Sequence, residues 1–100
     1  MKLVYPARFY KEKEGGYSVE VPDLRGCITQ ADTLEEAIEM AEDAALGWIL
    51  TAIEDDEELP VASKIEDIKL QNKNEFVSLL LLDISRRPSG LRKTKGYDNS

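Results

Sequence analysis

One long amphipathic helix is the feature that most limits what this chain can fold into. Thr33 is followed three residues later by Glu36, and this pairing is the capping box that typically starts a helix. From there, apolar residues recur at helical spacing as far as Ala52, opposite a row of acids. The pattern predicts a helix over residues 33–54, whose apolar face needs a second layer to cover it.

Strand patterns lie on both sides of this helix. Residues 2–11 and 17–21 alternate apolar and polar side chains with a glycine pair between them, and residues 27–31 form a shorter run. Such alternation predicts strands, and the glycines predict a hairpin turn. Residues 76–84 predict a final strand whose centre, residues 77–82, is almost uninterrupted apolar, which is typical of a strand buried on both faces or covered by another subunit. The predicted order is β-β-β-α-β, an α+β fold.

The connections predict the arrangement of the sheet. Short turns make the first three strands an antiparallel meander, and the helix then crosses back to place the fourth strand beside the first, giving the order 3-2-1-4. Since the third strand of a meander is parallel to the first, a helical crossover makes the fourth strand parallel to strand one as well. The helix packs on one face of the sheet. Pro6 lacks an amide donor and is expected at a free edge or a bulge.

Composition excludes several classes of function. The 100 residues contain no histidine and one cysteine, Cys27, so imidazole metal ligands, histidine-dependent nucleophiles and an internal disulfide are excluded. No apolar run approaches the ~20 residues of a membrane span, and the N-terminus lacks the apolar segment of a signal peptide. We therefore expect one small cytoplasmic domain without membrane association.

Charge is divided unevenly along the chain. Residues 1–85 hold 8 of the 13 basic and 19 of the 20 acidic side chains, a net charge of −11, whereas residues 86–100 hold the other five basic side chains and one acid. An acidic body repels nucleic-acid phosphate and attracts a basic partner. The sequence therefore predicts a domain over residues 1–85 and a basic, disordered tail over residues 86–100.

Candidate catalytic groups are few. Glu20, Asp23 and Asp32 lie near predicted strand ends and could together hold Mg²⁺, although turn and cap roles suit the two aspartates better. Cys27 has no histidine to activate it, so we expect a small buried residue. The sequence favours a protein that binds, without catalytic residues, metal or cofactor. A remnant metal-dependent hydrolase and a toxin-free interaction module remain as alternatives.

The most specific motif lies in residues 17–37, which read YSVEVPDLRGCITQADTLEEA. This segment resembles the HicB-type antitoxin family, in which a similar pattern leads into an alanine-rich helix with a tryptophan; Ala31 stands where the family has glycine. Residues 59–63 and 76–84 are similar to the family's Pro-x-Pro-Ser segment and its closing strand, so the likeness covers about residues 3–84. The residues that carry the motif are Tyr17, Pro22, Asp23, Leu24, Gly26, Cys27, Thr29, Asp32, Thr33, Glu36 and Ala37.

The resemblance implies a degenerate ribonuclease-H-like fold that lacks the metal-binding acids of the nuclease. It also implies an antitoxin that binds a small basic HicA-type toxin, an mRNA-cleaving ribonuclease, and covers the active site of that toxin. Many family members bind operator DNA through a C-terminal helix-turn-helix or ribbon-helix-helix. Residues 91–94 resemble the start of that linker, but no recognition motif follows, so DNA binding is not expected of this chain.

Two apolar surfaces predict a homodimer or homotetramer. With Ala41 at the centre of the buried helix face, steps of about 100° place Leu46, Leu50 and Ile53 on the far side. The fourth strand is an edge strand, and its centre around Leu80 has no charge to prevent pairing with another chain. We predict a two-fold interface through these four residues, unless the 55–75 connection folds back over the helix patch.

Overall fold

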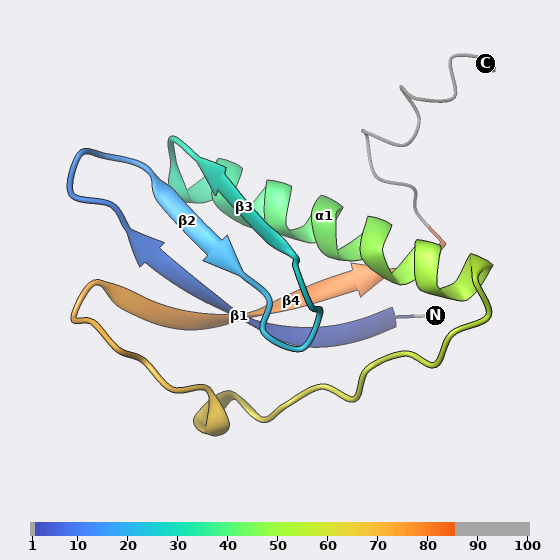
Figure 1. The fold of residues 1–100 in the computed structure, drawn as a ribbon. Coiled ribbons are helices and arrows are strands. Elements are labelled where there is room, and N and C mark those ends of the chain that lie inside the picture. Colours follow the sequence, from blue (N-terminus) through green and yellow to red (C-terminus); the bar gives the residue numbers. More distant parts are fainter. Residues whose placement is uncertain (1, 86–100) are drawn as a thin grey trace, which may run out of the picture.

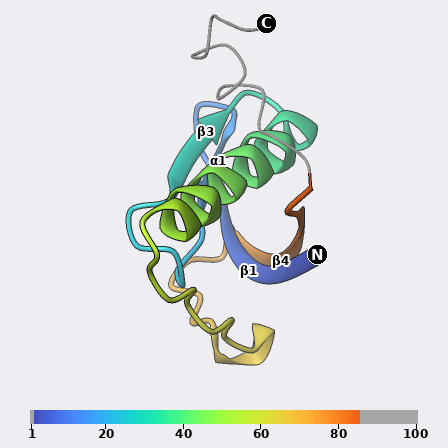
Figure 2. The same ribbon diagram turned by 90° about the vertical axis from the view of Figure 1, so that its right-hand side faces the viewer.

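The chain folds into one sheet with one helix on a single face, as Figures 1 and 2 show. The computed structural model describes residues 2–85, so the predicted basic tail lies outside the described residues. The elements in chain order are β1 (Lys2–Lys11), β2 (Tyr17–Glu20), β3 (Ile28–Ala31), α1 (Leu34–Glu54), the short 3₁₀ helix η1 (Ile65–Asp67) and β4 (Glu75–Asp83). The predicted β-β-β-α-β order is confirmed.

The strand order is also as predicted, but one strand runs in the opposite direction. The sheet has the order β3-β2-β1-β4, and β1, β2 and β3 form an antiparallel meander. β4 pairs with β1 in antiparallel register, from Lys2 opposite Asp83 to Tyr10 opposite Glu75. The prediction that the fourth strand is parallel to strand one is therefore wrong.

The direction of β4 follows from the connection after α1. The helix crosses the sheet once, and the chain between α1 and β4 then runs back along the length of the sheet, below it in Figure 1. At the end of this return, the Lys11 amide donates to the Asn74 carbonyl at 3.0 Å, so β4 starts beside the end of β1. The chain thus passes along the sheet twice between β3 and β4, once as α1 and once as the returning connection, and the second pass makes β4 antiparallel to β1 (Figure 1).

Two local features fit the pairing. β2 pairs with β1 only from Arg8 to Lys11, so Pro6 lies where β1 has a single neighbouring strand, β4. A residue without an amide donor is tolerated at such a free edge. In the β1–β2 turn, Gly16 has φ +86°, and a Cβ there would lie 2.9 Å from the Ala31 carbonyl oxygen. This turn therefore needs glycine.

The core lies between α1 and the facing side of the sheet. Tyr5, Ala7 and Phe9 alternate along β1 toward the helix and are at most 2% exposed. Phe9 stacks on Phe76 with ring centroids 5.1 Å apart, which joins β1 to the edge strand β4. The helix contributes mostly small residues, which let it approach the sheet closely: Ala37, Ala41, Ala45, Leu46, Ile49 and Ala52.

The structure corrects the surface positions predicted for Leu46 and Leu80. These side chains are 5% and 1% exposed, within the core of the chain. Ala41 and Ile49 both lie on the buried face of α1, and this face extends as far as Leu46, which lines a small cavity with Leu81, Leu82 and Asp83 at the end of β4. Leu50 packs against the core and is half-buried, and Ile53 is 44% exposed. The 55–75 connection runs away from α1 (Figure 2) and leaves this end of the helix uncovered.

Candidate functional site

The turn between β2 and β3 anchors the long connection that follows α1. Asp23 accepts hydrogen bonds from the Ser63 amide at 2.8 Å and from the Ser63 hydroxyl at 2.7 Å. Beside them, the Tyr5 hydroxyl donates to the Pro60 carbonyl. Burial and the nearby Asp23 carboxylate raise the pKa of Tyr5. The hydrogen bonds thus bring together the β2–β3 turn and the segment around Ser63, 40 residues later in the chain. Both segments are part of the sequence pattern that resembles the antitoxin family.

The other residues of this turn fix its backbone conformation and pack against the core. Leu24 is fully buried, Cys27 is 6% exposed and Pro22 is half-buried, while Gly26 has φ +81°. Backbone bonds from Leu24 to Val21 and from Cys27 to Leu24 close the loop. Burial raises the pKa of the Cys27 thiol, which keeps it protonated and unreactive. These motif residues have structural roles, as the sequence predicted for Cys27.

The remaining motif residues lie at the start of α1 and in the strands before it. The Thr33 hydroxyl accepts a hydrogen bond from the Glu36 amide at 3.1 Å, so the predicted helix cap is confirmed. Ala37 is fully buried one residue later. Tyr17 begins β2 and packs against the core, and Thr29 pairs with Val19 in the β2–β3 ladder.

The carboxylates proposed for a metal site do not come together. Glu20 pairs with Ile28 at one end of the β2–β3 ladder, whereas Asp32 follows Ala31 at the other end, at least three strand residues, or about 10 Å, away. Glu20 forms an ion pair with Arg8, and Asp23 binds Ser63. Within residues 2–85, no group of His, Cys, Asp and Glu could hold a metal ion. The described geometry therefore does not support the hydrolase alternative.

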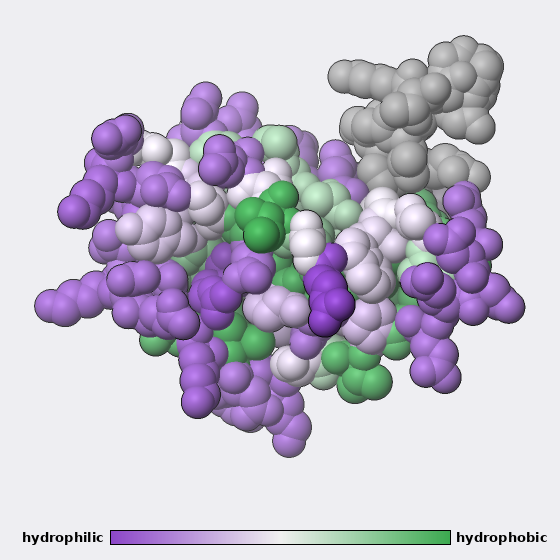
Figure 3. Space-filling model, in the orientation of Figure 1, coloured by the Kyte–Doolittle hydropathy of each residue, from purple (hydrophilic) through white to green (hydrophobic). Residues whose placement is uncertain are grey.

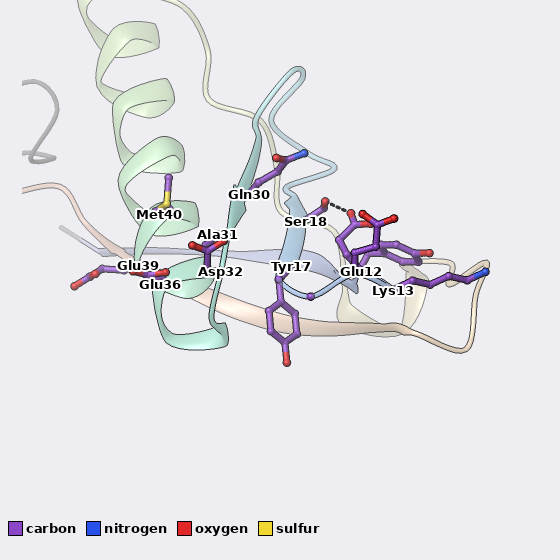
Figure 4. A pocket seen from close by; sticks show the side chains of 14 residues that line it. Glu12, Lys13, Tyr17, Ser18, Gln30, Ala31, Asp32, Glu36, Glu39 and Met40 are labelled. Atoms are coloured by element: carbon purple, nitrogen blue, oxygen red, sulfur yellow. Dashed lines mark hydrogen bonds between the residues drawn. The ribbon is translucent and has the colours of Figure 1, made fainter.

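An acidic groove lies at the end of the molecule that carries the β1–β2 turn. This end is mostly hydrophilic, on the left of Figure 3. The groove has a volume of about 1020 Å³. Glu36, Glu39 and Met40 of α1 lie on one side of it, and Glu12 and Lys13 lie on the other (Figure 4). The charged and aromatic residues that line it are Tyr10, Glu12, Lys13, Glu14, Tyr17, Asp32, Glu36 and Glu39.

The chemistry of this groove suits a cationic surface. Its lining has five carboxylates and a single ammonium group, and Glu12 also accepts a hydrogen bond from the Ser18 hydroxyl. Tyr10, Tyr17 and Met40 supply apolar area on which long basic side chains can rest. The sequence predicts the acidic body but not the groove. The signal for it was two acidic segments, residues 12–14 and 32–39, which the hairpin and the helix start bring together.

None of the helices within residues 2–85 has the length and apolar character of a membrane-spanning segment.

The chain is similar in sequence to known antitoxins. A family model described as the HicB-like antitoxin of bacterial toxin–antitoxin systems matches residues 5–95. An uncharacterized 14.9 kDa protein of Haemophilus phage HP1 is 37% identical over 82 residues, which are 82% of this chain and 61% of that protein. Antitoxin HicB 1 of Photorhabdus laumondii is 41% identical over 61 residues, 61% of this chain and 39% of that protein. The chain thus spans 39–61% of the length of these two relatives.

Solved structures show the same fold. A toxin–antitoxin complex from Streptococcus pneumoniae contains a chain that matches with a TM-score of 0.73 at 28% identity, over 85% of this chain and 71% of that one. The N-terminal domain of the Burkholderia pseudomallei antitoxin HicB matches with a TM-score of 0.71 at 26% identity, over 81% of this chain and 99% of that one.

Proposed function

Because this chain belongs to the family of HicB-like antitoxins, whose model matches residues 5–95, we propose that it neutralises a HicA-type toxin. In this proposal the toxin is a small basic mRNA-cleaving ribonuclease, and the antitoxin binds it and covers its active site. The family match is the observation that carries the proposal. The likeness to a chain of the Streptococcus pneumoniae toxin–antitoxin complex supports it.

The acidic groove is the surface that we assign to the toxin. Its five carboxylates face a partner of opposite charge, and the two tyrosines and Met40 supply apolar contact area. Single exposed ion pairs contribute little affinity, typically below about 1 kcal/mol each. Opposite fields instead orient the two proteins and speed their association. The groove therefore acts mainly on the rate and the specificity of binding.

The other two interpretations have less support. A hydrolase needs convergent acids, and Glu20 and Asp32 lie at opposite ends of the β2–β3 ladder. A toxin-free interaction module agrees with the fold as well as an antitoxin does, so only a functional assay separates the two.

Co-expression tests the proposal. The toxin candidate is the product of a short basic reading frame next to the gene, expressed in bacteria whose growth it arrests. We expect this chain to restore growth and to co-purify with the toxin. Failure of the wild-type chain to do either would contradict the antitoxin role.

Paired charge reversals test the location. Glu14→Lys with Glu39→Lys alters the groove, whereas Glu57→Lys with Glu58→Lys changes the net charge equally at exposed positions beyond the end of α1. We expect the first pair to weaken growth rescue and the second to leave it unchanged. Equal loss in both pairs would mean that the toxin binds elsewhere, while the antitoxin role would stand.

A further inference from the structure

We propose that the basic tail, residues 86–100, binds the acidic groove of its own chain and competes there with the toxin. The contact itself involves this chain alone. Its effect on toxin binding rests on the proposed function, because the toxin is assigned to the same groove.

The groove and the basic tail have opposite charge. The groove is lined by five carboxylates and a single ammonium group. Residues 86–100 carry five basic side chains and one acid, a net charge of +4, whereas residues 1–85 carry 8 basic and 19 acidic side chains, a net charge of −11. A basic segment attached to an acidic body is attracted to the place where the carboxylates are most concentrated.

The described fold places the start of the basic tail beside the groove. Asp83, the last residue of β4, lines a small cavity together with Glu39 of α1. Glu39 also lines the acidic groove, and it lies near Glu36 and Asp32 in Figure 4. Ser85, the last described residue, is two positions after Asp83. The chain therefore continues past Ser85 next to the helix side of the groove.

The basic tail is long enough to reach the groove. Its basic cluster, residues 92–95, begins seven residues after Ser85. An extended chain spans about 3.3 Å per residue, so this distance corresponds to at most roughly 23 Å. The groove acids on α1 lie within about one helical turn, roughly 5 Å, of Glu39. The cluster can therefore lie among the groove carboxylates while the sheet and the helix stay as they are.

Tethering makes the contact intramolecular. A short linker holds the basic cluster at an effective concentration in the millimolar range, so a contact that would be weak in a free peptide can occupy the groove. Exposed ion pairs contribute little individually and are screened by salt. The basic tail is therefore a reversible competitor, which occupies the groove at low ionic strength and gives way to a partner with more extensive contacts.

Paramagnetic relaxation in nuclear magnetic resonance spectra tests the contact without any toxin. Thr94→Cys carries a nitroxide label in the full chain, and Cys27 stays unlabelled because it is buried. At low salt, we expect the label to broaden the amide signals of residues 12–16, at the groove, and to spare those of residues 23–26, beyond the other end of the β2–β3 ladder.

Charge reversals show whether the broadening depends on the groove. Glu14→Lys with Glu39→Lys should remove it, whereas Glu57→Lys with Glu58→Lys, which changes the net charge equally, should leave it in place. Groove signals that are not broadened in the labelled chain, or equal broadening in the two charge-reversed pairs, would overturn the proposal.

The association rate with the toxin candidate tests the competition. The tail set neutralises three basic residues: Arg92→Gln, Lys93→Gln and Lys95→Gln. The control set neutralises three exposed lysines of the 55–75 connection: Lys64→Gln, Lys69→Gln and Lys73→Gln. Because both sets change the net charge equally, a difference between them reports the tail contact.

We expect the tail set to raise the association rate at low salt about threefold more than the control set does, and the difference to vanish at high salt. Equal rates for the two sets would overturn the competition. No toxin binding by any variant would overturn the competition together with the proposed function, while the nitroxide label still decides whether the basic tail contacts the groove.

Discussion

Asp23→Ala should lower the free energy of unfolding, because Asp23 anchors the connection that follows α1. Asp23 holds residue 63 to the β2–β3 turn through two hydrogen bonds, from the Ser63 amide and hydroxyl. The carboxylate accepts both bonds, so its removal breaks this link between the two segments of the motif and frees the start of the long connection.

The size of the effect follows from the chemistry of the two bonds. Hydrogen bonds to a charged group contribute about 1.5–3 kcal/mol each when protected from water. The pair is only part-buried, so we take a combined loss of about 2 kcal/mol, less than the roughly 3 kcal/mol that two well-protected bonds would contribute at the low end of that range. In a domain of this size, that loss lowers Tm by about 8–16 °C. Ser63→Ala keeps the amide bond and should lose about half as much.

Urea unfolding followed by circular dichroism measures these changes, with a double-mutant cycle on Asp23 and Ser63. We expect Asp23→Asn to fall between wild type and Asp23→Ala, because the amide oxygen still accepts one bond. A free energy of unfolding for Asp23→Ala within about 0.5 kcal/mol of wild type, the usual range for surface changes, would refute the anchoring role.

Three further predictions concern the cap, a buried tyrosine and catalysis. Thr33→Ala should cost about 1 kcal/mol through the lost helix cap, measured by urea unfolding; an unchanged stability would show that Asp32 caps instead. Folding raises the pKa of Tyr5 above its ordinary 10.0, so the contribution of Tyr5 to the free energy of unfolding is complete below about pH 10 and is lost as pH rises through the raised pKa. Tyr5→Phe should make the free energy of unfolding fall less steeply above about pH 10. An equally steep fall in the variant would contradict this role of Tyr5. RNA should stay intact with purified protein and Mg²⁺ or Mn²⁺ on a denaturing gel, and cleavage abolished by Asp23→Asn would revive the hydrolase.

Local signals predicted most of the fold. The capping box set the start of α1, and its hydroxyl–amide bond is present. Alternation in β1 identified the residues that face the helix, and Tyr5, Ala7 and Phe9 are buried there. These predictions succeeded because a helix cap depends on residues close in sequence, and the buried face of a strand depends on the spacing of its apolar residues alone.

The errors arose where the sequence pattern does not determine the direction of a strand or which of its side chains face the core. The connection between α1 and β4 has no strong periodicity, and the extra pass that it makes along the sheet reverses β4. The run from Val77 to Leu82 does not alternate, so nothing in it distinguishes the buried Leu80 from the exposed Leu79. On the helix, Ala41 is buried as predicted, but the buried face is wider than the helical steps alone suggested, so it also includes Leu46.

The sequence predicted the negative charge of the candidate site but not its position in the fold. The acidic composition favoured a basic partner, but the groove needs the β1–β2 hairpin to bring Glu12 and Glu14 toward the start of α1. The motif residues were found through a family resemblance, and the structure adds their physical role: Asp23 binds Ser63, and Thr33 caps the helix.

The rate of association with the toxin candidate, measured by stopped-flow fluorescence at several salt concentrations, tests the central claim most directly. Trp48, whose indole donates to the Arg25 carbonyl, supplies an intrinsic signal. We expect a one-to-one complex whose association rate falls steeply as salt rises from low to physiological ionic strength. Glu14→Lys with Glu39→Lys should lower the rate and its salt dependence more than Glu57→Lys with Glu58→Lys. A rate that does not change with salt, or no binding at all, would contradict recognition of a basic toxin through the acidic groove.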